Sequence, residues 1–286
     1  MVSTKMNQFL KQIRAGGKKF KAASIEQQRI DCDLAFAHLD IPETVNDTQS
    51  TLAGCHARRF QPKGCTSTGA VLYSHGGGYR TGSTTSHASL MAYLSLACDA
   101  AVVGIDYRLA PEHPFPAGLN DAVAAYQALI ESRAPGQIMI AGDSAGGGLA
   151  LACTLRLKEE GFPLPGCLTL ISPGLDHTAA LDDEADDSKA VGYAGDYPLE
   201  TVGISPIFGD MAGLPPILVH VADDEPFAER CSELVERTRA VEVSCDLTAY
   251  SEAFHVFHAF TNLPEAQRAT REIGDFFKFQ TKSPAR

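Results

Sequence analysis

The sequence predicts an α/β protein with a mostly parallel central sheet, helices on both faces of the sheet and a helical cap. Short, continuous apolar segments alternate with helical segments along most of the chain, which is typical of a parallel sheet covered on both sides. A strand, a glycine-rich turn and a helix follow one another at residues 137–152. A cap is indicated because a helical segment precedes the first strong strand and a long segment without a convincing strand separates two core strands.

The expected strands are short and apolar, and turn residues or helices separate them. They span residues 69–74, 101–105, 138–141, 167–171, 216–221 and 241–250, and residues 50–61 have weaker strand character. The expected helices between and after them span residues 119–133, 147–160, 227–239 and 264–280.

The first 45 residues are expected to form cap helices on a catalytic domain of residues 46–286. Basic and apolar residues at helical spacing predict an amphipathic helix over residues 5–29, interrupted at Gly16-Gly17. A second helix should end at Pro42 and carry one apolar stripe, formed by Ile30, Leu34, Ala37 and Ile41. We favour a packed cap with a solvated basic face over a mobile lid or a membrane-surface helix.

Residues 174–213 should contribute to the same cap, because they form the long segment between two core strands. The segment contains an acidic run at residues 182–187. Such a run is more typical of a solvated surface than of a metal site.

Composition limits the classes of partner. The chain of 286 residues has a net charge of −11, which argues against a nucleic-acid partner. Its eight cysteines are far apart and include no C-x-x-C pair, so we expect buried reduced thiols, and neither a metal nor a cofactor is implied. No segment approaches the roughly 18 apolar residues of a membrane span. We therefore expect a soluble protein in the cytoplasm; a homo-oligomer is compatible with the sequence.

Gly142, Ser144 and Gly146 match G-x-S-x-G between a strand and a helix. In a nucleophile elbow these glycines allow the strand and helix to approach closely, and the serine hydroxyl lies near the positive end of the helix. The alternative is an ordinary Gly/Ser turn. The rest of the chain must distinguish the two.

A serine nucleophile needs a base, a group that orients the base, and donors for an oxyanion. The glycine run of residues 75–78 follows a strand and can turn N–H groups toward an oxygen; it lacks the G-K-[ST] ending of a phosphate-binding loop. His255 follows the last expected strand as a candidate base, with His258 as the alternative. Three consecutive carboxylates, at residues 223–225, follow an earlier strand, and spacing alone does not choose among them.

With these motifs in order over residues 70–260, the sequence resembles the hormone-sensitive-lipase-like family of α/β-hydrolase esterases. The matching segments are His75-Gly-Gly-Gly-Tyr79, Asp106–Ala117, Gly142-Asp-Ser-Ala-Gly-Gly147, Leu170-Ile-Ser-Pro173, Ser205-Pro206, Gly213-Leu-Pro-Pro216 and His255-Val-Phe257. The resemblance implies an α/β-hydrolase fold. The sequence departs from the family pattern at Arg80, where an apolar residue is common, and in the loop of residues 250–254.

The resemblance also implies roles for individual residues. The catalytic triad would be Ser144, Asp224 and His255, with Asp223 as the alternative acid because Ala222 stands where the family has a glycine. The oxyanion hole would use the N–H groups of Gly77, Gly78 and Ala145. Tyr79 and Phe227 would line the substrate pocket, His75 would brace the glycine loop, and the Asp106–Ala117 segment would give structural support.

These roles predict a serine carboxylesterase that cleaves short- to medium-chain esters through an acyl-enzyme. The alternatives are an amidase or deacetylase with the same triad, and a non-catalytic ligand receptor on the same fold. The receptor alternative is disfavoured because a receptor of this kind lacks the triad histidine, and His255 is present.

Overall fold

The computed structural model describes residues 6, 23–178, 192–251 and 253–282. Most of the helix expected over residues 5–29, and all of the acidic run at residues 182–187, lie outside the described residues.

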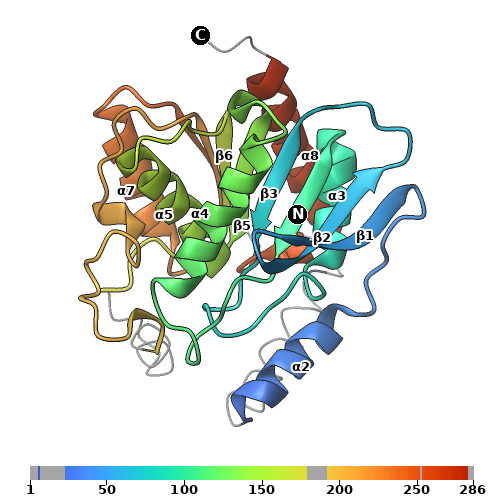
Figure 1. Ribbon diagram of the computed structural model, residues 1–286, viewed down its shortest axis with the longest axis horizontal. Helices are drawn as coiled ribbons and strands as arrows, with labels where there is room; N and C mark the ends of the chain where they lie inside the picture. The colour runs from blue at the N-terminus through green and yellow to red at the C-terminus, as the bar shows by residue number, and fades with distance from the viewer. Residues whose placement is uncertain (1–5, 7–22, 179–191, 252, 283–286) are drawn as a thin grey trace.

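An eight-stranded sheet forms the centre of the molecule (Figure 1), and its strand order is β1-β2-β4-β3-β5-β6-β7-β8. The strands are β1 (Val45–Leu52), β2 (Cys55–Pro62), β3 (Ala70–Ser74), β4 (Ala101–Ile105), β5 (Ile138–Asp143), β6 (Cys167–Ile171), β7 (Ile217–Ala222) and β8 (Cys245–Tyr250). The pairs β1–β2 and β2–β4 are antiparallel, whereas β4, β3 and β5–β8 pair in parallel. The carboxyl ends of the parallel strands therefore meet at one edge.

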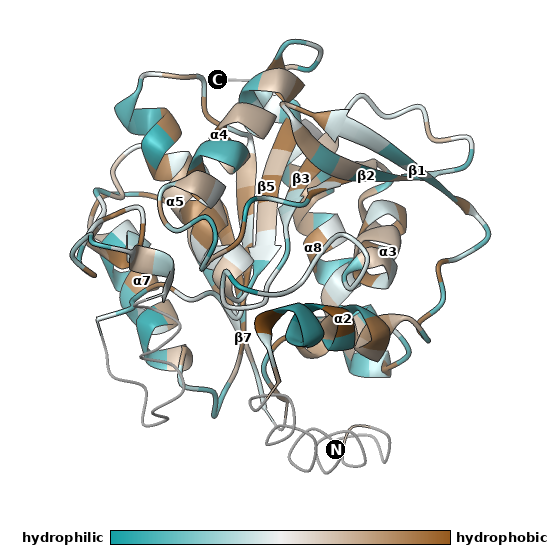
Figure 2. Cartoon of the chain, turned by 60° about the horizontal axis from the view of Figure 1, so that its bottom comes forward, coloured by the Kyte–Doolittle hydropathy of each residue, from teal (hydrophilic) through white to brown (hydrophobic). Residues whose placement is uncertain are grey.

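Helices cover both faces of this sheet. The helices are α2 (Ile25–Phe36), α3 (Ala88–Cys98), α4 (Ala117–Ile130), α5 (Ala145–Glu159), α7 (Ala228–Arg239) and α8 (Pro264–Lys282), and the short 3-10 helices are η1 (Pro135–Gln137), η2 (Pro206–Phe208) and η3 (Phe257–Ala259). Apolar residues of α4, α5 and α7 pack on one face of the sheet, while those of α3 and α8 pack on the other. All residues of β3–β7 are buried, which explains their continuous apolar sequences. Brown, hydrophobic segments of β3 and β5 are visible in Figure 2.

The structure confirms the α/β fold predicted from the sequence and changes three details. Residues 50–61 belong to a longer antiparallel hairpin, β1–β2. Helix α3 was not predicted because most of its side chains are buried, so it shows no amphipathic stripe. Strand β8 begins at Cys245 rather than at residue 241, because the N–H groups of Val241 and Val243 both donate to Thr238 O at the end of α7, with distances of 3.1 and 2.9 Å.

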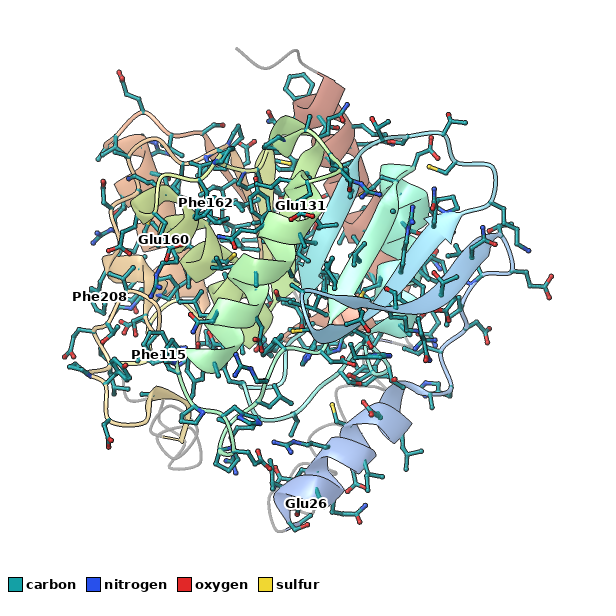
Figure 3. The ribbon with its side chains drawn as sticks, viewed as in Figure 1. Glu26, Phe115, Glu131, Glu160, Phe162 and Phe208 are labelled. Carbon is teal, nitrogen blue, oxygen red and sulfur yellow. The ribbon has the colours of Figure 1, made fainter. Side chains whose placement is uncertain are left out.

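Helix α2 lies beyond the carboxyl ends of the parallel strands (Figure 1), with the first-turn acid Glu26 near its N-terminal end (Figure 3). The expected apolar stripe is wrong as a packing face: Ile30 is 52% exposed and Leu34 is 65% exposed. The helix also ends at Phe36 rather than near Pro42. Its other side faces the molecule, where Arg29 donates to Ala110 O at 3.0 Å and pairs with Glu112 at 2.7 Å.

Candidate active site

Ser144 lies in a sharp turn between the end of β5 and the start of α5. Its φ of 52° and ψ of −121° are unusual for a residue with a side chain. The turn is fixed because Ser144 N–H donates to Ile171 O at 2.8 Å and Ser144 O accepts from Gly174 N–H at 2.9 Å. A Cβ atom at Gly146 would overlap Ser74 O, so only glycine allows this close approach of helix and strand.

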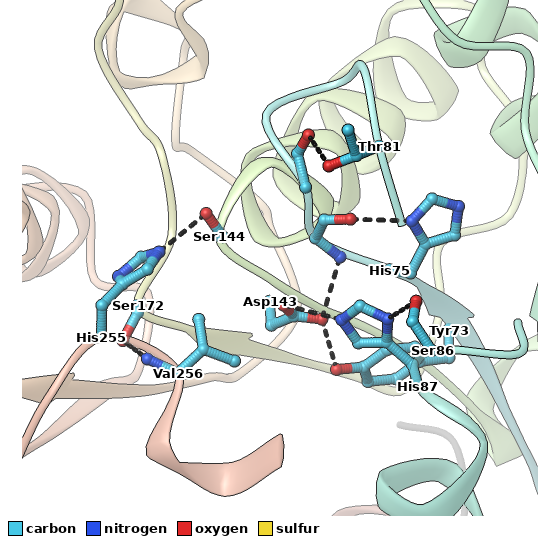
Figure 4. Close-up of polar contacts among 12 residues, drawn as sticks. Tyr73, His75, Thr81, Ser86, His87, Asp143, Ser144, Ser172, His255 and Val256 are labelled. Carbon is cyan, nitrogen blue, oxygen red and sulfur yellow. Dashed lines mark hydrogen bonds and ion pairs between the residues drawn. The ribbon is translucent and has the colours of Figure 1, made fainter. Parts of the chain in front are cut away.

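His255 faces the Ser144 hydroxyl from the loop after β8. Its Nε2 lies 2.9 Å from Ser144 Oγ (Figure 4), which is hydrogen-bond distance for a base and its nucleophile. The imidazole stacks on the Phe227 ring with 5.0 Å between centroids. His258, the alternative base, is instead fully buried, and its Nε2 lies 3.1 Å from His220 Nδ1. Of the two histidines, the structure brings only His255 to the serine.

The carboxylate beside His255 belongs to Glu225, which corrects the expectation of Asp224. Glu225 Oε2 lies 2.5 Å from His255 Nδ1. Residues 222–225 form a turn in which Glu225 N–H donates to Ala222 O at 3.4 Å, so Glu225 returns toward the sheet and is buried. Asp223 and Asp224 occupy the outside of this turn and are exposed. The three adjacent acids fit the motif almost equally well in sequence, and only the turn decides which of them points inward.

Ser172 is a polar residue at this site whose role was not predicted from the sequence. Its hydroxyl donates to Glu225 Oε1 at 2.6 Å, and Ala222 N–H donates to the same oxygen at 2.9 Å. Glu225 therefore has one oxygen held by two donors and the other directed at His255. The signal was present in the matching segment Leu170-Ile-Ser-Pro173, where the serine directly follows strand β6.

The glycine run after β3 forms a loop beside Ser144. Gly77 has a φ of 120° and Gly78 has a φ of 62°, conformations that favour glycine. Gly77 O fixes the loop by accepting from Thr81 N–H and from Thr81 Oγ1, both at 3.0 Å (Figure 4). Within the described part of the chain, the N–H groups of Gly77, Gly78 and Ala145 have no protein acceptor. These are the donors expected for an oxyanion.

Asp143, directly before Ser144, ties this loop to the sheet. It accepts from Tyr73 Oη at 2.7 Å and from Gly76 N–H at 3.1 Å, and it lies 3.3 Å from His87 Nε2 (Figure 4). Burial by itself raises the pKa of Asp143, but the charge and hydrogen bond of His87, together with the Tyr73 hydrogen bond and His75, outweigh burial and lower it. Burial by itself lowers the pKa of His87, but Asp143, with smaller contributions from the Ser83 carbonyl and Asp33, outweighs burial and raises it. A buried aspartate–histidine pair thus holds the residue before Ser144 and the start of the glycine loop.

His75 has contacts consistent with the bracing role expected of it. The ring is buried, stacks on Tyr107 at 4.4 Å between centroids, and places Nδ1 2.8 Å from Gly76 O. Burial and the neighbouring His87 lower the pKa of His75 to about 4. His75 is therefore a neutral imidazole near pH 7 that holds the glycine loop.

The Asp106–Ala117 segment also connects parts of the structure, through partners that the sequence did not identify. Asp106 contacts His56 Nδ1 at 2.6 Å and accepts from Thr84 N–H at 2.6 Å. Arg108 pairs with Asp121 at 2.7 Å. The segment thus links β2, the loop before α3 and helix α4 by charged contacts.

A cavity of about 660 Å³ contains the site. Ser144, His255, Gly77 and Gly78 line it together with residues of α2 and of the loop around η3, among them Phe36 and Phe260. This volume is typical of a small-molecule site. Neither Tyr79 nor Phe227 lines this cavity: Tyr79 is buried and stacks on Tyr193 at 3.6 Å, while Phe227 backs the His255 ring.

The described residues were also compared with the requirements of a metal site, a membrane-spanning helix and a disulfide bond. Across the residues that the structure describes, no group of three His, Cys, Asp or Glu side chains could hold a metal ion. None of the described helices is long and apolar enough to cross a bilayer. All eight cysteines are free thiols, and burial raises the pKa of the Cys153 thiol to about 12.

The parallel sheet, the strained serine turn and the glycine loop together define an α/β hydrolase. A family model described as alpha/beta hydrolase fold matches residues 71–259. The chain is 37% identical over 279 residues to an acetyl-hydrolase of Streptomyces hygroscopicus, covering 90% of this chain and 91% of that one. It is 32% identical over 249 residues to an esterase of Acinetobacter venetianus, covering 82% of each chain.

Solved structures show the same relationship. An esterase from the bacterial hormone-sensitive lipase family has a TM-score of 0.92 at 31% identity, covering 98% of this chain and 99% of that chain. An esterase/lipase from an uncultured bacterium has a TM-score of 0.87 at 33% identity, covering 95% and 99%. The chain belongs to the α/β-hydrolase family, within its hormone-sensitive-lipase group of carboxylic ester hydrolases.

Proposed function

We propose that the protein is a serine carboxylesterase that cleaves short- to medium-chain esters with a Ser144–His255–Glu225 triad. The observation that carries this proposal is the continuous set of contacts from Ser144 Oγ to His255 Nε2 and from His255 Nδ1 to Glu225 Oε2, at 2.9 and 2.5 Å. A neutral imidazole that donates Nδ1–H to Glu225 leaves Nε2 free to accept the serine proton.

Acylation follows from this arrangement. His255 Nε2 takes the proton of Ser144 as Oγ attacks the ester carbonyl carbon, and Glu225 stabilises the imidazolium that forms. The carbonyl oxygen becomes an oxyanion held by the N–H groups of Gly77, Gly78 and Ala145. The tetrahedral intermediate then expels the alcohol, which leaves with the proton from His255, and the acyl group remains on Ser144.

Deacylation repeats these steps with water. His255 removes a proton from a water molecule as it attacks the acyl carbon, and the same N–H groups stabilise the second oxyanion. When the intermediate collapses, His255 returns the proton to Ser144 Oγ and the carboxylic acid leaves. In comparable sites one oxyanion donor contributes about 10²–10³ in rate.

The cap of this enzyme is proposed to consist of residues 1–45 together with residues 174–213. Helix α2 supports this assignment, because Gln28, Cys32 and Phe36 line the cavity that contains Ser144. In the second segment, Tyr193 O accepts from Phe115 N–H at 2.7 Å, so this part of the segment is held against the loop before α4. The cap would then shape the substrate pocket rather than the catalytic groups.

A preference for short acyl chains is supported by the 37% identity to a protein named acetyl-hydrolase. Turnover of 4-nitrophenyl esters from acetate to palmitate tests it, and we expect kcat/KM to be highest for short to medium chains. Equal or better turnover of the palmitate ester would contradict the preference.

The mechanism itself is tested by Ser144→Ala. We expect ester hydrolysis to fall to the background rate, because the acyl-enzyme cannot form, while thermal unfolding stays cooperative. Retained hydrolysis of 4-nitrophenyl butyrate by a folded Ser144→Ala protein would refute the proposed nucleophile.

A further inference from the structure

Arg80 occupies a fixed position in the wall of the cavity that holds Ser144. It is one of the residues lining this cavity, and it is half-buried. Its N–H donates to Gly77 O at 3.2 Å, and its carbonyl accepts from Arg29 Nε at 2.8 Å. These contacts place the Arg80 backbone between the glycine loop and helix α2.

No described residue forms a hydrogen bond or ion pair with the Arg80 side chain. Three described carboxylates, one in the lining and two on neighbouring segments, have other partners. Glu112 pairs with Arg29 at 2.7 Å, and Asp33 accepts from Ser83 Oγ at 2.5 Å. Asp143, the acid that lines the cavity, is engaged by Tyr73, Gly76 N–H and His87. Among the described residues, no carboxylate therefore balances the positive charge of Arg80 at the cavity.

The positive charge of Arg80 lies in a cavity wall that is otherwise largely apolar. Many of the residues around the cavity are apolar or small, including Ala35, Phe36, Val256, Ala259 and Phe260. Arg80 as a residue is half-buried beside this surface, and a guanidinium that has no protein partner gains most from an anion, which it can bind through two parallel hydrogen bonds. The net charge of −11 offers no long-range attraction to an anion, so recognition must depend on this short-range contact.

We propose that the cavity takes esters that carry a carboxylate on the acyl or the alcohol part, and that Arg80 binds this carboxylate. The inference rests on the proposed function, because it assigns a substrate class to the same serine site. Arg80 acts here as a specificity residue and takes no part in bond breaking.

Two pairs of esters test the inference. The pair 4-acetoxybenzoate and methyl 4-acetoxybenzoate places the charge on the alcohol, and mono(4-nitrophenyl) glutarate and 4-nitrophenyl pentanoate place it on the acyl group. For each pair, the ratio of kcat/KM for the charged ester to that for the neutral ester is measured in the wild type, Arg80→Gln and Arg80→Lys. Spontaneous hydrolysis is subtracted, and intrinsic differences in ester reactivity cancel when the ratios are compared between proteins.

We expect Arg80→Gln to lower this ratio about 10-fold in at least one pair, because a hydrogen-bonded charge contact is lost. Arg80→Lys should retain part of the preference, and added salt should reduce the wild-type ratio. The pair that responds identifies the side of the ester that carries the charge. The matched control is Arg271→Gln, which removes the same charge from an exposed position on α8 and should leave both ratios unchanged.

Unchanged ratios in both pairs for Arg80→Gln would overturn the inference, as would an equal change in Arg271→Gln. Ser144→Ala separates this failure from failure of the proposed function. If Ser144→Ala abolishes hydrolysis of all four esters while Arg80→Gln leaves the ratios unchanged, only the substrate class is wrong. If Ser144→Ala retains hydrolysis, the proposed mechanism is wrong.

Discussion

Replacing Glu225 by glutamine changes the hydrogen-bond character of one atom at the site and almost nothing in its shape. Glu225 Oε1 accepts from both Ser172 Oγ and Ala222 N–H, so the amide oxygen of a glutamine must occupy this position. The amide NH₂ must then face His255 Nδ1, where the carboxylate oxygen was. His255 is forced to accept at Nδ1 and to carry its proton on Nε2, toward Ser144.

In that tautomer His255 cannot remove the proton from Ser144. We expect kcat to fall by about 10⁴ with little change in KM, which is the size of effect known when the orienting acid of a serine triad becomes an amide. Such a loss corresponds to about 5 kcal/mol of transition-state stabilisation. The assay is release of 4-nitrophenolate from 4-nitrophenyl butyrate, with circular dichroism to establish that Glu225→Gln is folded.

The matched control is Asp224→Asn, the same chemical change on the adjacent exposed residue. It should alter kcat by less than about twofold, since the Asp224 carboxylate is exposed and Glu225, not Asp224, contacts His255 Nδ1. An inactive Asp224→Asn together with an active Glu225→Gln would refute the assignment of the acid and restore the sequence-based expectation.

Two other perturbations test the surroundings of the triad. Ser172→Ala removes one of the two donors to Glu225 Oε1 and should lower kcat about 10-fold at unchanged KM, measured with the same ester; an unchanged kcat would show that Ala222 N–H is sufficient. Burial lowers the pKa of His220 to about 3, so the unfolded chain binds a proton that the folded protein does not as the pH falls below about 6.5. The free energy of unfolding is therefore unaffected by His220 protonation above that pH and decreases as the pH falls below it. His220→Phe should reduce the pH dependence of the unfolding free energy by about 1.4 kcal/mol per pH unit between pH 6 and 4, measured by urea unfolding, and an unchanged slope would contradict this sign.

Much of the catalytic geometry could be predicted because it depends on short local segments. The G-x-S-x-G turn, the glycine loop after β3 and the position of His255 after β8 each follow from a few consecutive residues that fit one backbone geometry. The parallel core was equally clear, since strands buried on both faces must be continuously apolar.

The acid could not be chosen in the same way, because the choice depends on how a turn bends. Asp223, Asp224 and Glu225 differ by one or two positions, and only the hydrogen bond from Glu225 N–H to Ala222 O, with donors from Ser172 and Ala222, brings the third of them inward. Ser172 follows β6, whereas Ala222 is the last residue of β7, and the sequence does not show which residues of separate strands meet.

The predicted packing face of helix α2 was wrong for a different reason. Ile30 and Leu34 fit an apolar stripe, yet they face outward, while Arg29 is directed toward the body by three polar contacts. A hydrophobic stripe predicts which side of a helix avoids water, but a charged side chain with fixed acceptors can decide the orientation instead.

The backbone of Ser144 sets a limit on how this protein can become more stable. A residue with a side chain at a φ of 52° and a ψ of −121° costs the folded state about 1–3 kcal/mol. Ser144, the proposed nucleophile, therefore also destabilises the native state, and glycine would relieve this backbone strain only by deleting the hydroxyl. Selection for thermostability alone would favour loss of the hydroxyl at this position. A more thermostable variant that keeps Ser144 must therefore gain its stability at sites away from the serine turn.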